Sequence, residues 1–164
     1  MTEVSEPRFA AKIVTRPALA RRLAELPRPM VFTNGVFDIV HRGHVSYLDR
    51  ARALGASLVV GVNTDASASR LDKGPDRPLN ALEDRLAVIA ALESVSVVVA
   101  FDEDTPLDLV LACHPDVIVK GGDYSVDTTV GAAEVIAWGG RFVPIPLLAG
   151  RSTSVLLRRI RAGR

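Results

Sequence analysis

Residues Met30–His44 read MVFTNGVFDIVHRGH and carry the first sign of an α/β fold. It opens with a short apolar run, Met30–Asn34, and ends in two histidines three residues apart. A run of this kind is typical of a strand buried on both faces of a parallel sheet. A helix that begins directly after such a strand forms one β/α repeat, so further repeats are expected along the chain.

The same alternation continues to the C-terminus. Further strands are predicted at Ser57–Asn63, Val95–Phe101, Asp116–Lys120 and Arg141–Pro146. Helices are predicted at His44–Leu54, Ala81–Leu92 (with Asn80 and Glu83 as a capping box), Pro106–Cys113, Thr129–Trp138 and Ser152–Ile160. Five β/α repeats predict an α/β fold, a Rossmann-like doubly wound parallel sheet of about five strands with helices on both faces.

The chain is expected to hold one main domain, because 164 residues suit a single hydrophobic core. That domain is predicted at residues 30–164. Residues 1–29 are predicted to form a lead-in and a short helix, in which Leu19, Leu23 and Leu26 recur at helical spacing.

Composition excludes several classes of protein. Twenty basic and 19 acidic side chains give a net charge of +1, which provides no general attraction to nucleic acid or to an anionic membrane. No apolar run approaches the roughly 20 residues that cross a bilayer, and no signal peptide is evident. The single cysteine, Cys113, is expected to be a buried structural thiol. A cytoplasmic protein is predicted.

The histidine pair, His41 and His44, is the strongest sign of chemistry. Three residues is close to one helical turn, so both rings can face the same way. Gly43 between them lets a ligand approach the backbone, and a helix N-terminus favours phosphate. Zinc is the rival ligand, but a catalytic zinc site needs three protein ligands, and the pair supplies two. Phosphate is therefore the preferred prediction.

Other polar groups follow the remaining strands, where ligands of such sheets bind. They are Asn63 and Asp65, then Lys120, Gly121 and Asp123, and finally Ser152, Thr153 and Ser154 with Arg158. The basic end of the chain, from Arg151 onward, has five arginines and no acid, which suits either a solvated face or phosphate contact. These groups predict an anion site at one edge of the sheet.

The loop from Arg70 to Pro78 is expected to act as a lid. It carries Lys73 and Arg77 among glycine and proline, and it has almost no apolar side chain to anchor it. We expect it to be mobile without ligand and to close over a triphosphate. ATP with Mg²⁺ should then raise amide-exchange protection there more than in the helix Ala81–Leu92.

Two motifs resemble a known superfamily. GVFDIVHRGH at 35–44 and RSTSVLLR at 151–158 resemble the two signatures of the HxGH nucleotidyltransferases, the second of which reads approximately ISSTxxR. Residues 32–160 most resemble the bacterial heptose 1-phosphate adenylyltransferase domain, through VGVNTDAS, RPLNALEDR, VIVKGGDY and GRSTS. The kinase domain of bifunctional forms has no room here, and the lid is longer than in that family.

The resemblance implies transfer of AMP from ATP, with Mg²⁺, to heptose 1-phosphate, giving ADP-heptose for lipopolysaccharide synthesis. It implies catalytic roles for His41, His44, Lys120 and Arg158. It implies nucleotide contacts for Thr33, Asn34, Gly35, Phe37, Gly43, Asn63, Asp65, Lys73, Arg85, Gly121, Asp123, Ser152, Thr153 and Ser154. Asp38 and Asp123 are candidates to hold the acceptor sugar, and Asp38 could instead orient a histidine. Arg85 could also be an exposed charge. A homodimer is expected.

Two other functions stay open. A cytidylyltransferase acting on a polyol phosphate such as glycerol 3-phosphate would use the same site with a different base and acceptor. A catalytically silent nucleotide-binding module would keep the fold alone, but the intact pair of motifs argues against it.

Overall fold

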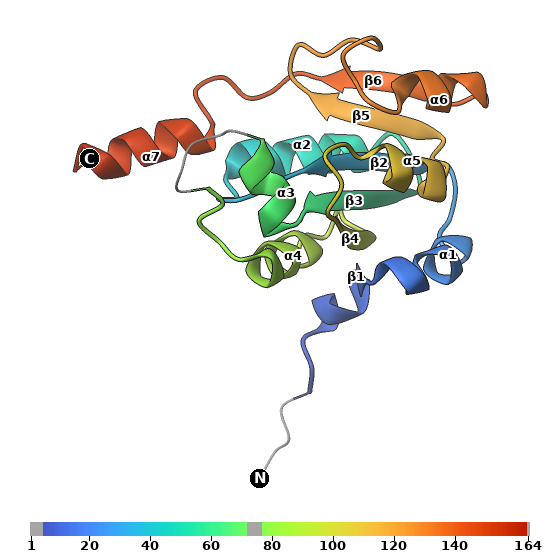
Figure 1. Ribbon diagram of the computed structural model, residues 1–164, viewed down its shortest axis with the longest axis horizontal. Helices are drawn as coiled ribbons and strands as arrows, with labels where there is room; N and C mark the ends of the chain where they lie inside the picture. The colour runs from blue at the N-terminus through green and yellow to red at the C-terminus, as the bar shows by residue number, and fades with distance from the viewer. Residues whose placement is uncertain (1–4, 72–76, 164) are drawn as a thin grey trace.

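The computed structural model describes residues 5–71 and 77–163. Within them, six parallel strands form one sheet in the order β1-β4-β3-β2-β5-β6, with helices around it (Figure 1). The strands are β1 (Ile13–Val14), β2 (Met30–Gly35), β3 (Ser57–Asn63), β4 (Val97–Phe101), β5 (Val117–Gly121) and β6 (Arg141–Ile145). The helices are α1 (Arg16–Ala24), α2 (Arg42–Arg52), α3 (Asp65–Arg70), α4 (Leu82–Ala90), α5 (Leu107–Cys113), α6 (Ala132–Ala137) and α7 (Thr153–Arg161), with a 3-10 helix at Arg8–Lys12. The α/β prediction is confirmed.

The edge strand β1 was not predicted. Ile13 and Val14 pair in parallel with Val98 and Val99 of β4. Two residues are too few to show a strand pattern in the sequence, since such patterns need about four. Leu19 of α1 then packs in the core beneath the sheet, so the segment before residue 30 is joined to it.

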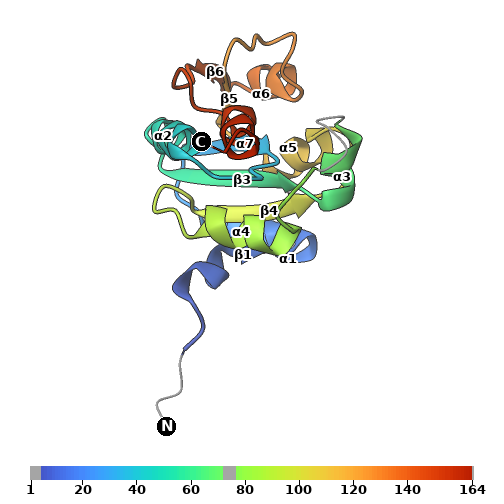
Figure 2. The same ribbon diagram turned by 90° about the vertical axis from the view of Figure 1, so that its left-hand side faces the viewer.

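Alternating side chains divide the core into two layers, one on each face of the sheet. On one face, α2 and α4 pack against strand residues such as Leu58 and Val60. On the other face, α1, α5 and α6 pack against residues such as Val59 and Phe32. Figure 2 shows helices on either side of the strands. Burial of both faces explains why the central strands read as continuous apolar runs.

The strand order reverses between β2 and β5, inside the sheet. The chain runs from β2 outward to β3 and β4, and then returns to β5 on the other side of β2. In doubly wound sheets, ligands bind beyond the carboxyl ends of the strands at such a reversal. The segments after β2 and β5 hold the histidine motif and the KGGDY string, so the fold brings these two motifs to the same place.

Two helix starts differ from the prediction. α2 begins at Arg42, two residues earlier than expected, and His41 is its N-cap residue. α4 has Ala81 as its N-cap without a side-chain cap, so the capping box with Asn80 and Glu83 is wrong. The amide groups of Asn80 bond to Asp38 instead, because a long-range partner is available in the folded chain.

Two further segments also differ. α3 forms directly after β3, where only a polar loop had been expected; the Thr64 hydroxyl caps it by accepting from Ser67 N–H. α6 begins at Ala132 rather than Thr129, because the preceding Gly131 has a φ of 89°, outside the helical region.

Cys113 lies at the end of α5 and is 2% exposed, which confirms the predicted buried thiol. Burial raises the pKa of this thiol to about 12, and the charge of Arg16 only partly offsets the effect. Among the described residues, none of the helices has the length and apolar character needed to cross a bilayer.

Candidate active site

A cleft of about 600 Å³ lies at the carboxyl ends of β2 and β5. Its walls come from the loop after β2, the start of α2, the end of β5 and the start of α7. The lining residues are Asn34, Gly35, Val36, Phe37, Asp38, His41, Gly43, His44, Tyr47, Ala68, Arg77, Lys120, Gly121, Tyr124, Leu147, Arg151, Ser152, Thr153 and Ser154. The fold therefore gathers both predicted motifs around one cavity.

The two histidines cap the helix that they begin. His41 Nδ1 accepts a hydrogen bond from Gly43 N–H at 3.0 Å, and His44 Nδ1 accepts from His41 N–H at 3.4 Å. The rings stack with centroids 4.0 Å apart and planes 28° apart. This reciprocal capping explains the three-residue spacing, since each ring satisfies a backbone donor at the helix N-terminus.

The caps also fix where the imidazole protons lie. In a neutral imidazole one nitrogen donates and the other accepts, so an Nδ1 that accepts leaves the proton on Nε2. Burial lowers the pKa of His41, and the positive charge of Arg151 lowers it further. His41 is therefore neutral at pH 7, and its Nε2–H is a hydrogen-bond donor.

Gly43 is required by the position of the His41 ring. A Cβ at this position would lie 2.8 Å from His41 Cε1 and 2.9 Å from His41 Nδ1. It would also lie 3.3 Å from Arg151 Cβ, just before α7. Any side chain at residue 43 would displace the ring that caps α2, so the glycine of the motif leaves room for the His41 ring.

Phe37 supports His44 from the loop after β2. Its backbone has a φ of 51°, a left-handed conformation that is uncommon for a residue other than glycine. Its ring meets His44 edge-on, with centroids 5.6 Å apart and planes 68° apart. A Cβ on Gly35 would lie 3.1 Å from Phe37 Cε2, so Gly35 leaves room for this ring.

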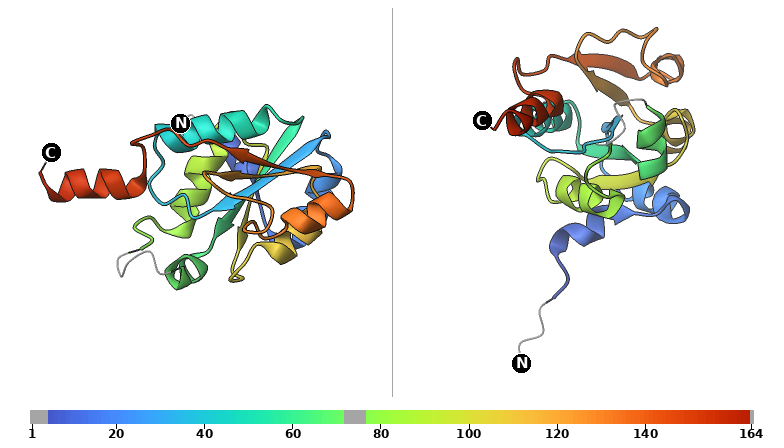
Figure 3. Two further views of the ribbon diagram at one scale, coloured as in Figure 1. Left: turned by 90° about the horizontal axis from the view of Figure 1, so that it is seen from above. Right: turned by 60° about the vertical axis from the view of Figure 1, so that its left-hand side comes forward.

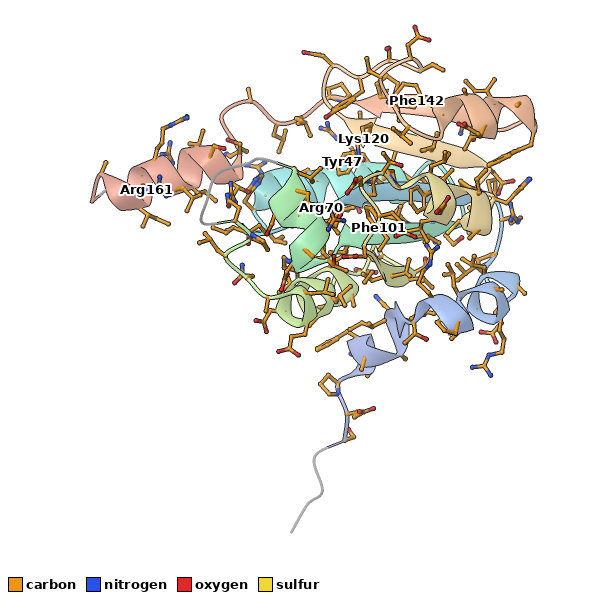
Figure 4. The ribbon with its side chains drawn as sticks, viewed as in Figure 1. Tyr47, Arg70, Phe101, Lys120, Phe142 and Arg161 are labelled. Carbon is orange, nitrogen blue, oxygen red and sulfur yellow. The ribbon has the colours of Figure 1, made fainter. Side chains whose placement is uncertain are left out.

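Lys120 brings a positive charge to the cleft from the end of β5. Its Nζ donates to the side-chain oxygen of Asn34 at 2.8 Å and to the Asn34 carbonyl oxygen at 3.2 Å. Figure 4 labels Lys120 and Tyr47, two residues of the cleft wall. Thr33 is buried behind this wall, where its hydroxyl lies 2.6 Å from Tyr47 Oη, so it supports the wall without lining it.

The start of α7 forms another wall of the cleft, beside the histidine motif. The Ser152 hydroxyl accepts from Val155 N–H and so caps this helix, and the Thr153 hydroxyl donates to Ile39 O at 3.4 Å. Arg151, Ser152, Thr153 and Ser154 all line the cleft. Arg158, by contrast, is exposed and lies outside the cleft lining, because α7 projects from the body of the molecule (Figure 3).

Asp38 is committed to the chain itself. Its Oδ1 accepts from Leu79 N–H and Asn80 N–H at 2.8 and 2.9 Å, and its Oδ2 pairs with Arg77 Nη1 at 2.7 Å. Burial acts to raise the pKa of this carboxyl, but the three hydrogen bonds and the Arg77 charge hold it below the usual value. Asp38 fixes the segment that follows the predicted lid rather than orienting a histidine.

Four other predicted nucleotide contacts lie away from the cleft lining. The Asn63 amide donates to Ser67 Oγ inside the fold, and Asp65 accepts from Arg85, which is buried and not the exposed charge considered above. Asp123 is exposed on the loop after β5. Lys73 lies outside the described residues, as does most of the predicted lid.

Several cleft residues were not assigned a role from the sequence. Tyr47 follows His44 by three residues, and this helical spacing could have revealed it. Tyr124 ends the VIVKGGDY string but was given no role of its own, and Leu147 carries no pattern that marks it. Among the described residues, no three His, Cys, Asp or Glu side chains cluster as a protein-held metal would need.

Comparison with known proteins places the chain in a family. The Cytidylyltransferase-like family model matches residues 32–143. A D-beta-D-heptose 1-phosphate adenylyltransferase of Bordetella bronchiseptica is 57% identical over 162 residues, or 98% of this chain and 100% of that protein. The bifunctional protein HldE of Methylobacillus flagellatus is 56% identical over 131 residues, which is 80% of this chain and 27% of that protein.

Solved structures agree with the fold. A lipopolysaccharide core biosynthesis protein from Thermoplasma volcanium superposes with a TM-score of 0.60 at 30% identity, over 73% of this chain and 95% of that one. Pantothenate synthetase from Thermus thermophilus superposes with a TM-score of 0.58 over 90% of this chain and 70% of that one. At 17% identity, the second likeness concerns the fold alone.

Proposed function

This chain belongs to the cytidylyltransferase-like family of nucleotidyltransferases, and on that premise we propose that it transfers AMP from ATP to heptose 1-phosphate, giving ADP-heptose and pyrophosphate. The observation that carries the proposal is the 57% identity, over nearly the whole chain, with a relative of that activity. The cleft supports it, because two imidazoles, a lysine and a helix N-terminus meet there. The product would serve lipopolysaccharide synthesis.

The proposed reaction is an in-line displacement at phosphorus. An oxygen of the sugar phosphate attacks the α-phosphorus of ATP. A new P–O bond forms, the bond to the β-phosphate breaks, and pyrophosphate leaves with the electron pair. The attacking oxygen is already anionic, so no side chain has to remove a proton. The site then has two tasks, to position the reactants and to stabilise charge on the phosphoryl oxygens.

The histidines are suited to the second task. Their Nδ1 atoms are held by backbone N–H groups, so Nε2–H is the donor of each neutral ring. We propose that these donors contact the α-phosphoryl oxygens and the departing pyrophosphate. Because the rings are already capped and stacked, little reorganisation is needed when charge develops, which is the condition under which such donors are most effective.

Positive charge for the phosphates is proposed to come from several walls of the cleft. Lys120, Arg77 and Arg151 line it, and the N-terminus of α7 adds the positive end of a helix dipole. Mg²⁺ would enter on the triphosphate, since this ion is held largely by water and substrate phosphates, and it would neutralise part of the phosphate charge. Asp123 is the proposed contact for the acceptor sugar: it is exposed between the cleft residues Gly121 and Tyr124, whereas both oxygens of Asp38 are already bonded.

We also propose a cytoplasmic location, where ATP is available, and a homodimer. The location would be tested by fractionation of the producing cells. The oligomeric state would be tested by sedimentation equilibrium at micromolar concentration. A monomer at that concentration would remove the dimer from the proposal without affecting the chemistry.

A pyrophosphate-release assay tests the reaction. The four nucleoside triphosphates would be tried with Mg²⁺, each with heptose 1-phosphate, with glycerol 3-phosphate, or with no acceptor. We expect turnover that needs ATP, Mg²⁺ and heptose 1-phosphate together. Turnover with CTP and glycerol 3-phosphate alone would replace the proposal with a cytidylyltransferase. Tight nucleotide binding without turnover on any acceptor would indicate a silent module.

A further inference from the structure

Arg85 is the largest of the fully buried side chains in the described part of the molecule, with 1% of its surface exposed. It lies on α4, in the segment that follows the predicted lid. A buried guanidinium is costly unless hydrogen bonds satisfy it. What surrounds Arg85 therefore indicates why the fold keeps a charge in its interior.

The guanidinium is directed at the chain itself. Nη1 donates to the carbonyl oxygen of Val36 at 2.7 Å, and Nε donates to the carbonyl oxygen of Asn80 at 3.0 Å. Nη2 pairs with Asp65 Oδ1 at 2.7 Å; the Asp65 side chain is half exposed at the start of α3. Arg85 does not line the cleft. Two backbone carbonyls and one carboxylate thus satisfy it from three different segments.

The two carbonyls belong to the segments that Asp38 also joins. Val36 directly precedes Phe37 and Asp38 in the loop after β2. Asp38 accepts from Leu79 N–H and Asn80 N–H in the segment before α4. The loop after β2 and residues 77–80 are therefore fastened together twice, once through the Asp38 carboxylate and once through the Arg85 guanidinium.

These two sets of bonds hold Val36 and Asp38, the residues on either side of Phe37. Phe37 has a positive φ, and such a conformation persists only where the surrounding structure determines it. The Phe37 ring rests edge-on against His44. A shift of Val36 would move Phe37 and release His44 from one of its supports. Arg85 therefore acts on the position of His44 through Val36 and Phe37.

We propose that Arg85 is a positioning residue for the adenylyl transfer described above, and the inference rests on that proposed function. It holds the loop after β2 against residues 77–80, keeps Phe37 in its left-handed conformation and so aims His44. It touches neither nucleotide nor acceptor. This assigns Arg85 a role different from the nucleotide contact implied by the family resemblance.

The test separates turnover from binding. Arg85→Lys keeps the charge. Its donors all lie on one nitrogen, so they cannot bond to the two carbonyls and the carboxylate that three separate guanidinium nitrogens reach. We expect kcat to fall at least tenfold while the Kd for ATP, measured by titration calorimetry, stays within twofold. Arg22→Lys is the matched control: Arg22 pairs with Glu25 at the surface of α1, and both constants should be unchanged.

Two further measurements guard against a variant that fails to fold. Asp65→Asn weakens the same network at its half-exposed partner, and kcat should fall two- to fivefold with ATP affinity unchanged. In Arg85→Ala, millimolar guanidinium should restore part of kcat, whereas methylammonium at the same concentration should not.

Three results would overturn the role of Arg85. They are a normal kcat in a folded Arg85→Lys, a normal kcat in Asp65→Asn, and a tenfold loss of ATP affinity with kcat preserved, which would make Arg85 a direct nucleotide ligand. An inactive wild-type protein would instead overturn the proposed function, so the two failures are distinguishable.

Discussion

The two walls of the cleft are built differently. The wall after β2 is held by its own bonds: the His41 ring accepts from Gly43 N–H, the His44 ring accepts from His41 N–H, Phe37 supports His44, and Asp38 is bonded on both oxygens. The wall at α7 has fewer contacts with the rest of the molecule. α7 has no buried residue, its first turn is joined to the loop after β2 by one long hydrogen bond from Thr153, and Arg158 is exposed.

The difference indicates how the two walls divide the work. Donors that are already in place stabilise developing charge without reorganisation, so the histidine wall should mainly affect turnover. A helix with few contacts must be ordered by the ligand that it binds, and the entropy of ordering reduces the net affinity that it contributes. The α7 wall should therefore mainly affect nucleotide affinity, and by less.

Removal of a histidine tests the first half of this comparison and should have the largest effect. His44→Ala should lower kcat by about a hundredfold, since a preorganised donor is typically worth about 3 kcal/mol, while the Kd for ATP changes little. Single-turnover kinetics with saturating ATP measures the effect.

The control for this variant is His114→Ala. His114 stacks on Trp138 outside the cleft, with centroids 4.0 Å apart, so turnover should be normal. Near-normal turnover of His44→Ala would contradict the distinct role of the histidine wall, as would loss of activity that Zn²⁺ restores and Mg²⁺ cannot.

Lys120→Ala should have the next largest effect, and on affinity. Its ammonium lines the cleft, and a hydrogen bond to a charged group contributes about 1.5–3 kcal/mol, so the Kd for ATP should rise roughly tenfold or more. Calorimetric titration of ATP in the presence of Mg²⁺ measures this change. An unchanged Kd would mean that the bond to Asn34 is a structural contact and that Lys120 does not reach the triphosphate.

Arg158→Ala sharpens the comparison, because it tests whether α7 changes position when nucleotide binds. Arg158 is exposed in this structure, and exposed charges typically contribute about 0.2–1 kcal/mol, so the Kd for ATP should rise by no more than about fivefold. The same titration measures it, with Arg159→Ala as the control on the same helix. A loss of ATP affinity as large as that of Lys120→Ala would show that α7 becomes fully ordered when nucleotide binds, so that the two walls no longer differ.

The pH dependence of His41 gives the smallest expected effect. Burial and Arg151 hold its pKa below the ordinary histidine value, so the unfolded chain binds the proton more readily than the folded chain. Stability and the caps of α2 should therefore weaken as the pH falls from about 6.5 through the lower folded pKa. Arg151→Ala removes one cause, and it should move the acid limb of the kcat profile to higher pH.

An NMR titration of the His41 Cε1 proton measures the pKa in both proteins. Burial remains in the variant, so its pKa should still lie below the ordinary value. An acid limb at the same pH in Arg151→Ala would show that the α7 wall has no electrostatic influence on the histidine wall.

Periodicity and local motifs predicted much of this architecture. The runs at Ser57–Asn63 and Met30–Asn34 were found because both faces of these strands are buried. β1 was missed because two residues carry no period, and Asn80 was misjudged because Asp38 competes for its amide groups. In these cases a partner distant in the sequence determines the local structure.

The site shows the same division. His41, His44 and Gly43 were predicted to lie together at a helix start because their spacing is itself the geometry of one, and they do so. The contacts of Asp38 and Arg85 were not predicted, because Asn80 lies 42 residues from Asp38 and Val36 lies 49 residues from Arg85 in the sequence. A charge on a predicted helix looks the same in sequence whether it faces solvent or two backbone carbonyls.

The single thiol has a consequence for handling this protein. Alkylating reagents attack the thiolate, and Cys113 has a pKa of about 12 and 2% exposure at the end of α5. Modification therefore requires that α5 first separate from the sheet. The rate of alkylation in excess reagent then reports how often that face of the molecule opens, so the wild-type chain carries its own probe of native-state opening without an added label.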